Sequence, residues 1–195
     1  MKKLSAVALA TLMSVAVSPV FAAGFNLNDA AGILSQVQGG NSASSDKAQQ
    51  ALTLLTKAKA MGVKPEQAAG GVGAMLSLAK NQLQSNDYAT LTQKVPGINK
   101  VTGVGALTQL SQLTAKNPQL QALIGQVNPV SSDAKVAVSN VTDKSQLDSA
   151  FEKLGMNSSM VQQFAPVITD YLGTQGVASP LLTSLGGLWG VEQPL

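Results

Sequence analysis

The chain lacks three residue types that carry much of protein chemistry: histidine, cysteine and arginine. Without histidine it has neither the usual general base nor the commonest metal ligand. Without cysteine it can form no thiolate nucleophile, thiolate metal site or disulfide, so packing alone must hold the fold. All 13 basic residues are lysines. The absence of guanidinium groups excludes their bidentate recognition of phosphate, carboxylate and guanine.

Charged and aromatic residues are also scarce. Charged residues make up 12% of the chain and aromatic residues 4%, against about 25% charged residues in a typical soluble protein. The 45% of hydrophobic residues supports one folded domain whose core is mainly Leu, Val, Ala and Met. Its surface must then be carried by Gln, Asn, Ser and Thr, which favours contact with other proteins or with a matrix.

The first 22 residues have the three parts of a secretory signal peptide. Met1–Lys3 gives a positively charged start, and the run Leu4–Val17 forms an apolar centre. Val20 and Ala22 fit the small-residue pockets of signal peptidase, so the pattern predicts cleavage after Ala22. The alternative is a transmembrane anchor, but the run is shorter than the ~18–20 residues needed to span a bilayer. We expect an exported protein, periplasmic or extracellular, that begins at Ala23 when mature.

The charge balance argues against a nucleic-acid partner. Lys2 and Lys3 would leave with the signal peptide, so eleven lysines would face ten acidic residues in the mature chain, a net charge near +1. This value is too low for a nucleic-acid binder. Lysines exceed acids between Asp46 and Lys116, and acids exceed lysines from Asn117 onward. Either a weak dipole that favours head-to-tail contact or scattered solvated charge accounts for this distribution.

The domain is expected to be all-α, a compact multi-helix bundle of helical hairpins. We divide the chain into a signal peptide at 1–22, a flexible N-terminal appendage with a Gly/Ser linker at 23–45, and a helical domain at 46–195. That domain can itself have two parts, 46–127 and 143–195. Apolar residues recur at helical spacing through it, and strand-like alternation is almost absent.

Glycine, proline and capping residues place the helix ends. The expected helices run from Leu27 to Leu34, from near Asp46 to Gly62, from Pro65 to Leu83, from Ser85 or Asp87 to just before Val95, through Leu107 and Leu113 to near Asn117, from Pro118 through Ile124, from Leu147 to Leu154, from Ser158 to Tyr171, and from Ser179 to Trp189. Pro166 should kink or shorten its helix because it lacks a backbone donor. The stretch Asn128–Asp143 has no helical period and favours a loop.

A weak internal similarity joins two segments of the domain. Lys59–Leu76 resembles Glu152–Thr169, with Met61–Val63 aligned on Leu154–Met156. In both, a helix ends at glycine, a hydrophobic residue follows, and a new helix begins two or three residues later. This pattern is typical of a left-handed glycine cap. It is consistent with a duplicated helical hairpin and equally with convergence on one kind of corner. A shorter similarity pairs residues 71–74 with residues 103–106, both Gly-Val-Gly-Ala.

Two blocks of the sequence carry a resemblance to a known family. The first block is Met61–Leu76 with Ala79–Asn81 and Val95–Gly97, and the second is Phe151–Met156 with Met160–Val167. Together they resemble the VcgC/VcgE-type proteins, exported bacterial proteins of unassigned function, over roughly Leu52 to Trp189. The resemblance implies export and a helical domain. It supplies no activity and no catalytic residue.

Ser77 and Lys80 match the Ser-x-x-Lys element of serine acyl-enzymes, in which the lysine one helical turn away can deprotonate the serine. Ser44–Lys47 and Ser132–Lys135 match equally well, and about one match to so short a motif is expected by chance. Lys100–Gly103 misses the accompanying Lys-Thr-Gly element by one residue. An ordinary helix surface is therefore the favoured interpretation of Ser77.

Glycines and carboxylates give no clearer site. Gly70–Gly73 lacks the preceding strand and the spacing of a phosphate-binding loop, and it favours close approach of a neighbouring helix instead. Asp148 and Glu152 lie four residues apart and could share a cation, but Lys144 makes a solvated charge ladder the better explanation. Asp170 stands alone near a helix end. We therefore expect no catalytic residue, no metal site and no cofactor.

The stretch Val177–Gly190 is apolar apart from one threonine and two serines, and it holds the single tryptophan, Trp189. Three interpretations are open: packing in the core against Phe151 and Phe164, insertion into a membrane interface, or docking on a partner. Few lysines flank the stretch, which favours packing. The sequence as a whole indicates a non-enzymatic exported protein that acts by self-association, protein contact or envelope contact. An envelope hydrolase using carboxylate or Ser/Lys chemistry is the alternative.

Overall fold

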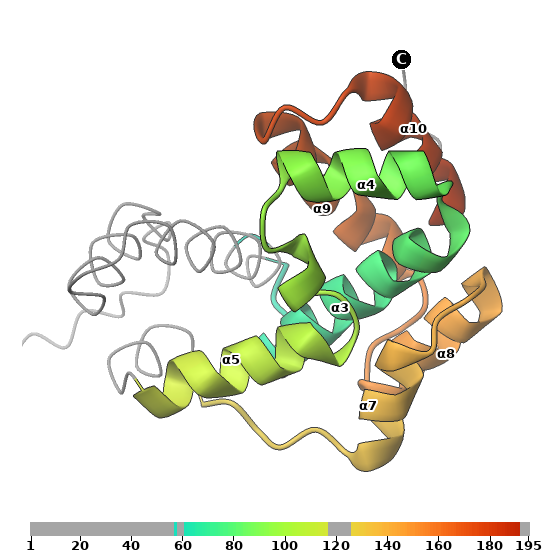
Figure 1. The fold of residues 1–195 in the computed structure, drawn as a ribbon. Coiled ribbons are helices and arrows are strands. Elements are labelled where there is room, and N and C mark those ends of the chain that lie inside the picture. The colour runs from blue at the N-terminus through green and yellow to red at the C-terminus, as the bar shows by residue number, and fades with distance from the viewer. Residues whose placement is uncertain (1–56, 58–60, 117–125, 192–195) are drawn as a thin grey trace, which may run out of the picture.

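The computed structural model describes residues 57, 61–116 and 126–191, and within these ranges its regular structure is all helical, with turns and loops between the helices and no strand (Figure 1). The all-α expectation is therefore confirmed. The elements in chain order are α3 (Pro65–Gln82), α4 (Ser85–Lys94), the 3-10 helix η1 (Ile98–Lys100), α5 (Val104–Lys116), α7 (Ser132–Ser139), α8 (Lys144–Lys153), α9 (Met160–Thr174) and α10 (Ser179–Leu188). The signal peptide, the appendage and the helices expected at Leu27, Asp46 and Pro118 lie outside the described residues.

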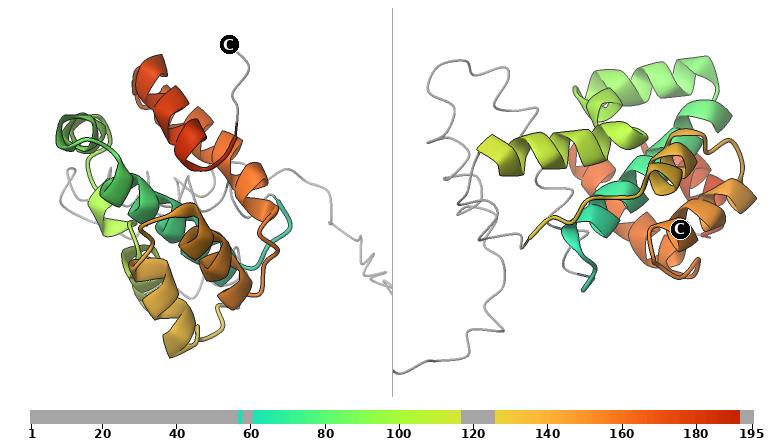
Figure 2. Two further views of the ribbon diagram at one scale, coloured as in Figure 1. Left: turned by 90° about the vertical axis from the view of Figure 1, so that its right-hand side faces the viewer. Right: turned by 90° about the horizontal axis from the view of Figure 1, so that it is seen from below.

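Helix α3 is the centre of the domain. It begins where the sequence predicts, because Pro65 takes the first helical position and Gln67 accepts a hydrogen bond from the backbone N–H of Lys64 at 3.0 Å. Every residue from Ala68 to Ala79 is buried. Helices α5, α7, α8, α9 and α10 all pack against α3, which runs between the α7–α8 pair and the α9–α10 pair (Figure 2).

Glycines in α3 allow its neighbours to approach closely. A Cβ atom on Gly73 would lie 2.2 Å from the carbonyl oxygen of Gly103, and one on Gly71 would lie 2.8 Å from the ring of Phe164. The backbone N–H of Gly103 donates to the carbonyl of Gly73 at 2.8 Å. The two Gly-Val-Gly-Ala segments therefore touch each other, and the close-packing interpretation of Gly70–Gly73 is confirmed.

The stretch between Asn128 and Asp143 is not a continuous loop, as the sequence pattern suggested, because α7 occupies its middle. The side chain of Ser131 accepts from the backbone N–H of Ala134 at 3.2 Å and caps this helix. Only Ala134 and Val138 of α7 are buried, and Val136 is 59% exposed. Two buried residues in eight give too narrow an apolar stripe for a helical period to stand out.

The C-terminal helices end at glycine corners. Gly155, Gly176 and Gly190 have φ of 75°, 81° and 72°, in the left-handed region that glycine adopts without strain. After each glycine a hydrophobic residue donates back to the last turn, as Met156 does to the carbonyl of Phe151 at 2.9 Å. Gly62 also has a positive φ, 79°. The corner predicted at Gly155 is confirmed, and at Gly62 the left-handed glycine and the helix that follows it are confirmed.

Two details of helix ends differ from the sequence prediction. The N-cap of α4 is Gln84, and neither Ser85 nor Asp87 caps it with a side chain. Helix α9 begins at Met160 after Ser159, not at Ser158, and it runs through Pro166 without being shortened. Pro166 is exposed, so the carbonyl that lacks an amide partner faces water, which lowers the cost of the proline.

The predicted stripe of α8 is confirmed, with Leu147, Ala150 and Phe151 all buried. Phe151 meets Phe164 of α9 edge to face, with ring centroids 5.4 Å apart and an interplanar angle of 84°. Edge-to-face pairs add about 0.5–1.5 kcal/mol beyond area burial. In a chain with few aromatic residues, this contact joins α8 to α9. Phe164 also packs against Gly71 of α3.

We expect Gly73→Ala to lower the free energy of unfolding by about 1–3 kcal/mol, because the new methyl group would overlap the backbone of Gly103. Gly187→Ala is the matched control. Gly187 is an exposed residue within α10, and a Cβ there meets nothing within 4 Å, so alanine should stabilise the helix by up to about 1 kcal/mol. Urea unfolding followed by circular dichroism measures both. Equal shifts for the two variants would contradict the close approach.

Candidate functional site

The most organised polar group in the described residues is a row on α3. The hydroxyl of Ser77 donates to the carbonyl of Ser139 at 3.1 Å, and the amide of Asn81 donates to the carbonyl of Val141 at 2.8 Å. Gln82 donates in the same way to the carbonyl of Thr142. These bonds hold the end of α7 and the connection to α8. The connection is not helical, so its backbone carbonyls have no partners within a helix and need them from elsewhere.

Gln67 performs the same task at the other end of α3. Its side-chain amide donates to the carbonyls of Leu154 and Gly155, at 3.1 Å each. These carbonyls belong to the corner after α8, where the last turn of a helix leaves acceptors unpaired. Helix α3 therefore fixes both ends of α8 through side chains that bind backbone.

Ser77 does not form a Ser/Lys catalytic pair in this structure. Its side chain is buried, 3% exposed, and its hydroxyl proton is committed to Ser139. Lys80 is exposed, whereas a lysine that acts as a base must be desolvated to lose its proton near neutral pH. Ser132 and Lys135 are both exposed on α7. The match at Ser44–Lys47 lies outside the described residues.

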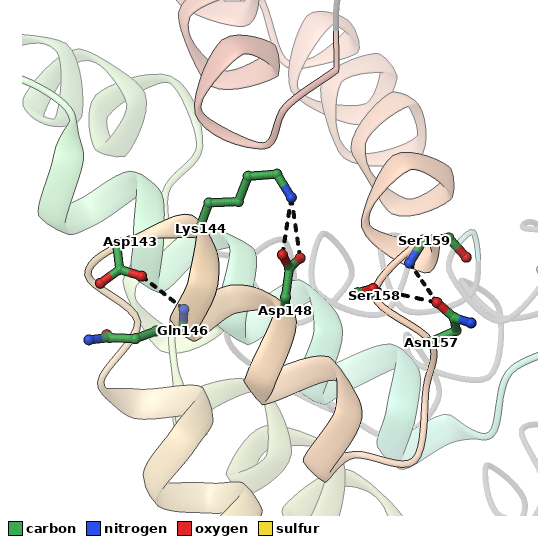
Figure 3. Close-up of polar contacts among 7 residues, drawn as sticks. All are labelled: Asp143, Lys144, Gln146, Asp148, Asn157, Ser158 and Ser159. Atoms are coloured by element: carbon green, nitrogen blue, oxygen red, sulfur yellow. Dashed lines mark hydrogen bonds and ion pairs between the residues drawn. The ribbon is translucent and has the colours of Figure 1, made fainter.

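The carboxylates of α8 serve the helix itself. Lys144 and Asp148 form an exposed ion pair at 3.2 Å, one turn apart, which confirms the charge ladder (Figure 3). Asp143 caps α8 by accepting from the backbone N–H of Gln146 at 2.9 Å. Glu152 is exposed. No cluster of three or more acidic residues that could hold a metal ion occurs among the described residues.

The turn between α8 and α9 is ordered by one amide side chain. The Oδ1 atom of Asn157 accepts from the backbone N–H of Ser159 at 3.0 Å and from the hydroxyl of Ser158 at 3.5 Å (Figure 3). An asparagine that binds the backbone two residues on forms an Asx-turn. The polar residues before α9 therefore direct the chain into the helix.

Glu66 is a buried acid that the sequence pattern did not single out. It is 8% exposed, and its Oε1 atom accepts from the side-chain amide of Asn128 at 3.0 Å. Its Oε2 atom is buried without a hydrogen-bond partner. Glu66 lies in the first turn of α3, where the helix dipole stabilises a negative charge. With a single carboxylate and one amide, the arrangement lacks the second acid or base of a general acid–base pair.

Trp189 is a core residue. Its side chain is fully buried, at 0% exposure, and its indole N–H donates to the carbonyl of Met75 in α3 at 3.1 Å. The packing interpretation of Val177–Gly190 is confirmed for this residue, which is not available to a membrane interface. Among the helices of the described ranges, none combines the length and apolar character required to cross a bilayer.

Two tyrosines have perturbed acidity. Burial raises the pKa of Tyr171 well above its usual value of 10, because the phenolate would be desolvated. Burial also raises the pKa of Tyr88, and a hydrogen bond with Thr102 offsets part of that effect. The hydroxyl of Tyr88 donates to Asn99 at 2.6 Å. Asp170, beside Tyr171 in the chain, is exposed. At neutral pH both tyrosines are protonated, so neither supplies a base.

Sequence reasoning did not identify Asn81, Gln82 or Gln67 as positioning residues. The available signal was their spacing, because Ser77, Asn81 and Gln82 are separated by four and one residues on an otherwise apolar helix. Of these, Ser77 and Asn81 lie four residues apart and share one side of the helix, whereas the adjacent Asn81 and Gln82 do not face each other. The carbonyls that they bind cannot be read from the chain.

A family model described as "Protein of unknown function VcgC/VcgE (DUF2780)" matches residues 11–186. This range covers most of the chain and includes both blocks that carry the resemblance. No curated protein and no solved structure matches the chain significantly.

We expect Asn81→Ala to lower the free energy of unfolding by about 1 kcal/mol, because the carbonyl of Val141 loses its donor. Asn86→Ala on α4 is the control, since the Asn86 side chain is exposed and its loss should stay within about 0.5 kcal/mol. Thermal and urea unfolding measure the two variants. A loss at Asn81 no larger than that at Asn86 would show that the row does not hold the connection.

The tyrosines make the fold sensitive to alkali. Tyr171 stays protonated in the folded state at pH values where the unfolded chain ionises it, because its folded pKa is raised. Its contribution to stability is complete below pH about 10 and is lost as the pH rises towards the folded pKa. Tyr171→Phe should therefore flatten the fall in stability above pH about 10. Tyr88→Phe should flatten it less, as urea midpoints measured against pH would show. An unchanged slope in Tyr171→Phe would be the contrary result.

Proposed function

Since the chain belongs to the VcgC/VcgE family of proteins of unknown function, we propose that it is an exported, non-enzymatic protein that acts by contact with another protein or with the cell envelope. One observation carries the proposal. Several side chains that could perform chemistry in the described residues hold the fold instead, namely Ser77, Asp143 and Asp148.

Catalysis by these groups would require them to be released from their present partners. The proton of Ser77 already bonds a carbonyl inside the domain, and Lys80 is exposed on the surface. Asp148 is neutralised by Lys144, and Asp143 caps a helix. Ser77, Asp143 and Asp148 thus each have a structural role that catalysis would disrupt, which favours contact over chemistry.

Export is supported by the N-terminal pattern. Met1–Lys3, the apolar run Leu4–Val17 and the small residues Val20 and Ala22 fit a cleavable signal peptide. The absence of cysteine from the chain means that folding outside the cytoplasm needs no disulfide chemistry. Packing and the side-chain bonds of α3 suffice to hold the described domain.

Cell fractionation tests the location. The wild-type chain should appear in the periplasm or medium with an intact mass that begins at Ala23, and a variant without residues 2–22 should stay in the cytoplasm. Full-length mass in the inner membrane would support an anchor instead. Retention of the unprocessed chain in the cytoplasm would refute export.

A photo-crosslinking residue at Gln93 or Gln163, both exposed, tests the mode of action in living cells. Contact with a defined partner should give a discrete adduct from at least one position. The cytoplasmic variant without residues 2–22 should not give it. Ser77→Ala and Lys80→Ala should leave the adduct yield within about twofold once folded protein is equalised, since neither side chain is proposed to act chemically. Absence of any adduct from a panel of exposed positions would contradict the proposal.

A further inference from the structure

The last turns of α5 are not buried by the helices that the structure describes. Nearer its start, Ala106, Leu107 and Leu110 are buried. Beyond Leu110 none of the side chains at residues 111–115 is buried. Leu113 continues the apolar stripe of the helix at a spacing of three residues, but it is only half-buried. We call residues 111–115 the outer part of α5.

The outer part of α5 extends past the start of α3. The two helices meet where Gly73 approaches Gly103 and Ala106, and from there α5 runs back towards the N-terminal end of α3 (Figure 1, Figure 2). At 1.5 Å per residue, α3 starts about 12 Å from Gly73, whereas α5 ends about 20 Å from Gly103. More than one turn of α5 therefore lies beyond Pro65, where α3 cannot cover it.

The chain that precedes α3 enters the domain at this same end. Gly62, with φ of 79°, forms a corner, and α3 begins at Pro65. Met61 and Val63 are half-buried and pack against the core, so the corner itself is held in place. The connection from Gly62 to Pro65 spans at most about 11 Å. The segment before Gly62 is therefore delivered beside the start of α3, within reach of the outer part of α5.

The sequence of residues 46–60 suits a helix that packs on an apolar stripe. Ala51, Leu52, Leu55 and Ala58 recur at helical spacing. Lys57, the residue of this segment that the structure describes, is helical and half-buried. A half-buried lysine lays its aliphatic stem along other groups while its ammonium stays in water. The segment thus has both the pattern and, at Lys57, the burial of a packed helix.

Glu66 shows that the same end of α3 lacks a hydrogen-bond donor. It lies in the first turn of the helix and is 8% exposed. Asn128 donates to its Oε1 atom, while its Oε2 atom is buried without a partner. A buried acceptor without a donor is costly, and few occur in folded proteins. Residues 46–60 carry hydroxyl, amide and ammonium donors, so a segment packed at this end can supply the bond.

The second glycine corner shows the arrangement that we expect at the first. Residues 59–76 resemble residues 152–169, so Gly62 corresponds to Gly155. The helix before Gly155 is α8, which folds back to pack against α9, the helix after the corner, and against α3. A helix that ends at Gly62 can return along the domain in the same way.

We propose that residues 46–60 form a helix that docks on the outer part of α5 and covers the N-terminal end of α3. Leu52 and Leu55 then meet Leu113, and the docked helix brings a donor to Glu66. The occupant is this segment because the short connection at Gly62 holds it at the site, at an effective concentration of about millimolar. The inference is independent of the proposed function, and it places the start of the folded domain near residue 46.

Engineered cysteines test the docking, because the natural chain has none to compete with them. On the mature chain, Ala115→Cys in the outer part of α5 is combined with a cysteine placed in turn at each of residues 48–58. Disulfides should form at positions three or four residues apart, since one side of a docked helix faces α5. Gln163→Cys on α9 is the matched control, since Gln163 is also exposed. It should give less than about a tenth of the yield.

The mass of the product separates the occupants. Docking within one chain should give a disulfide at monomer mass under non-reducing conditions. A reducible dimer formed through Ala115→Cys would assign the outer part of α5 to a second copy and would overturn the proposal. Equal yields at every position would also overturn it, as would yields no higher than those with Gln163→Cys.

Stability provides a second measurement that needs no cysteine. Leu55→Ala and Leu113→Ala should each lower the urea midpoint of the mature chain. The double variant should lose clearly less than the sum of the two losses, because each leucine has no partner to lose once the other is gone. Leu55→Ala combined with Leu182→Ala is the control, since Leu182 is a half-buried leucine of α10, and its losses should add. Additive losses in both pairs would refute the docking.

Discussion

The approach of two backbones at Gly73 and Gly103 is the constraint on which the domain depends. A side chain at position 73 would overlap a carbonyl oxygen, so α3 can approach the segment before α5 this closely only because position 73 is glycine. Gly70 and Gly71 make similar room for Leu154 and for Phe164. Each glycine costs of order 1 kcal/mol in helix propensity relative to alanine. That cost is offset by the enclosure of α3 on several sides, which buries its residues from Ala68 to Ala79.

The enclosed part of α3, from Ala68 to Ala79, leaves no surface for function, and several polar residues of the helix bind backbone within the domain. Ser77, Asn81 and Gln82 bind the carbonyls of the α7–α8 connection, and Gln67 binds the corner after α8. Every residue has a backbone carbonyl, so these bonds fix the path of the chain and do not depend on which side chains the bound segments carry. Together with the indole of Trp189 on the carbonyl of Met75, they give a chain without disulfides directional contacts between segments that are distant in sequence.

Local signals were sufficient for much of the fold and insufficient for its contacts. Pro65 at the start of α3 and the glycine corners at Gly62 and Gly155 could be predicted because a cap depends on a few neighbouring residues. Helix α7 was missed because only Ala134 and Val138 are buried along it, and its cap at Ser131 stands among other serines. The bond between Gly73 and Gly103 could not be predicted, since the repeated Gly-Val-Gly-Ala motif says that each backbone can be approached and does not say by what.

The candidate site shows the same division between local pattern and tertiary contact. The Ser-x-x-Lys match at Ser77 is a local pattern that is typical of a catalytic serine. In the structure Ser77 is buried, and its hydroxyl donates to the backbone carbonyl of Ser139. The charge ladder of α8 could be predicted, because an ion pair one turn apart on an exposed helix needs no tertiary contact. Lysines and acids cover α7 and α8, while α9 and α10 expose one carboxylate in two helices. With α3 enclosed from Ala68 to Ala79, most of the exposed surface of the described domain lies on the outer helices, where a charge predicted from the sequence keeps its meaning.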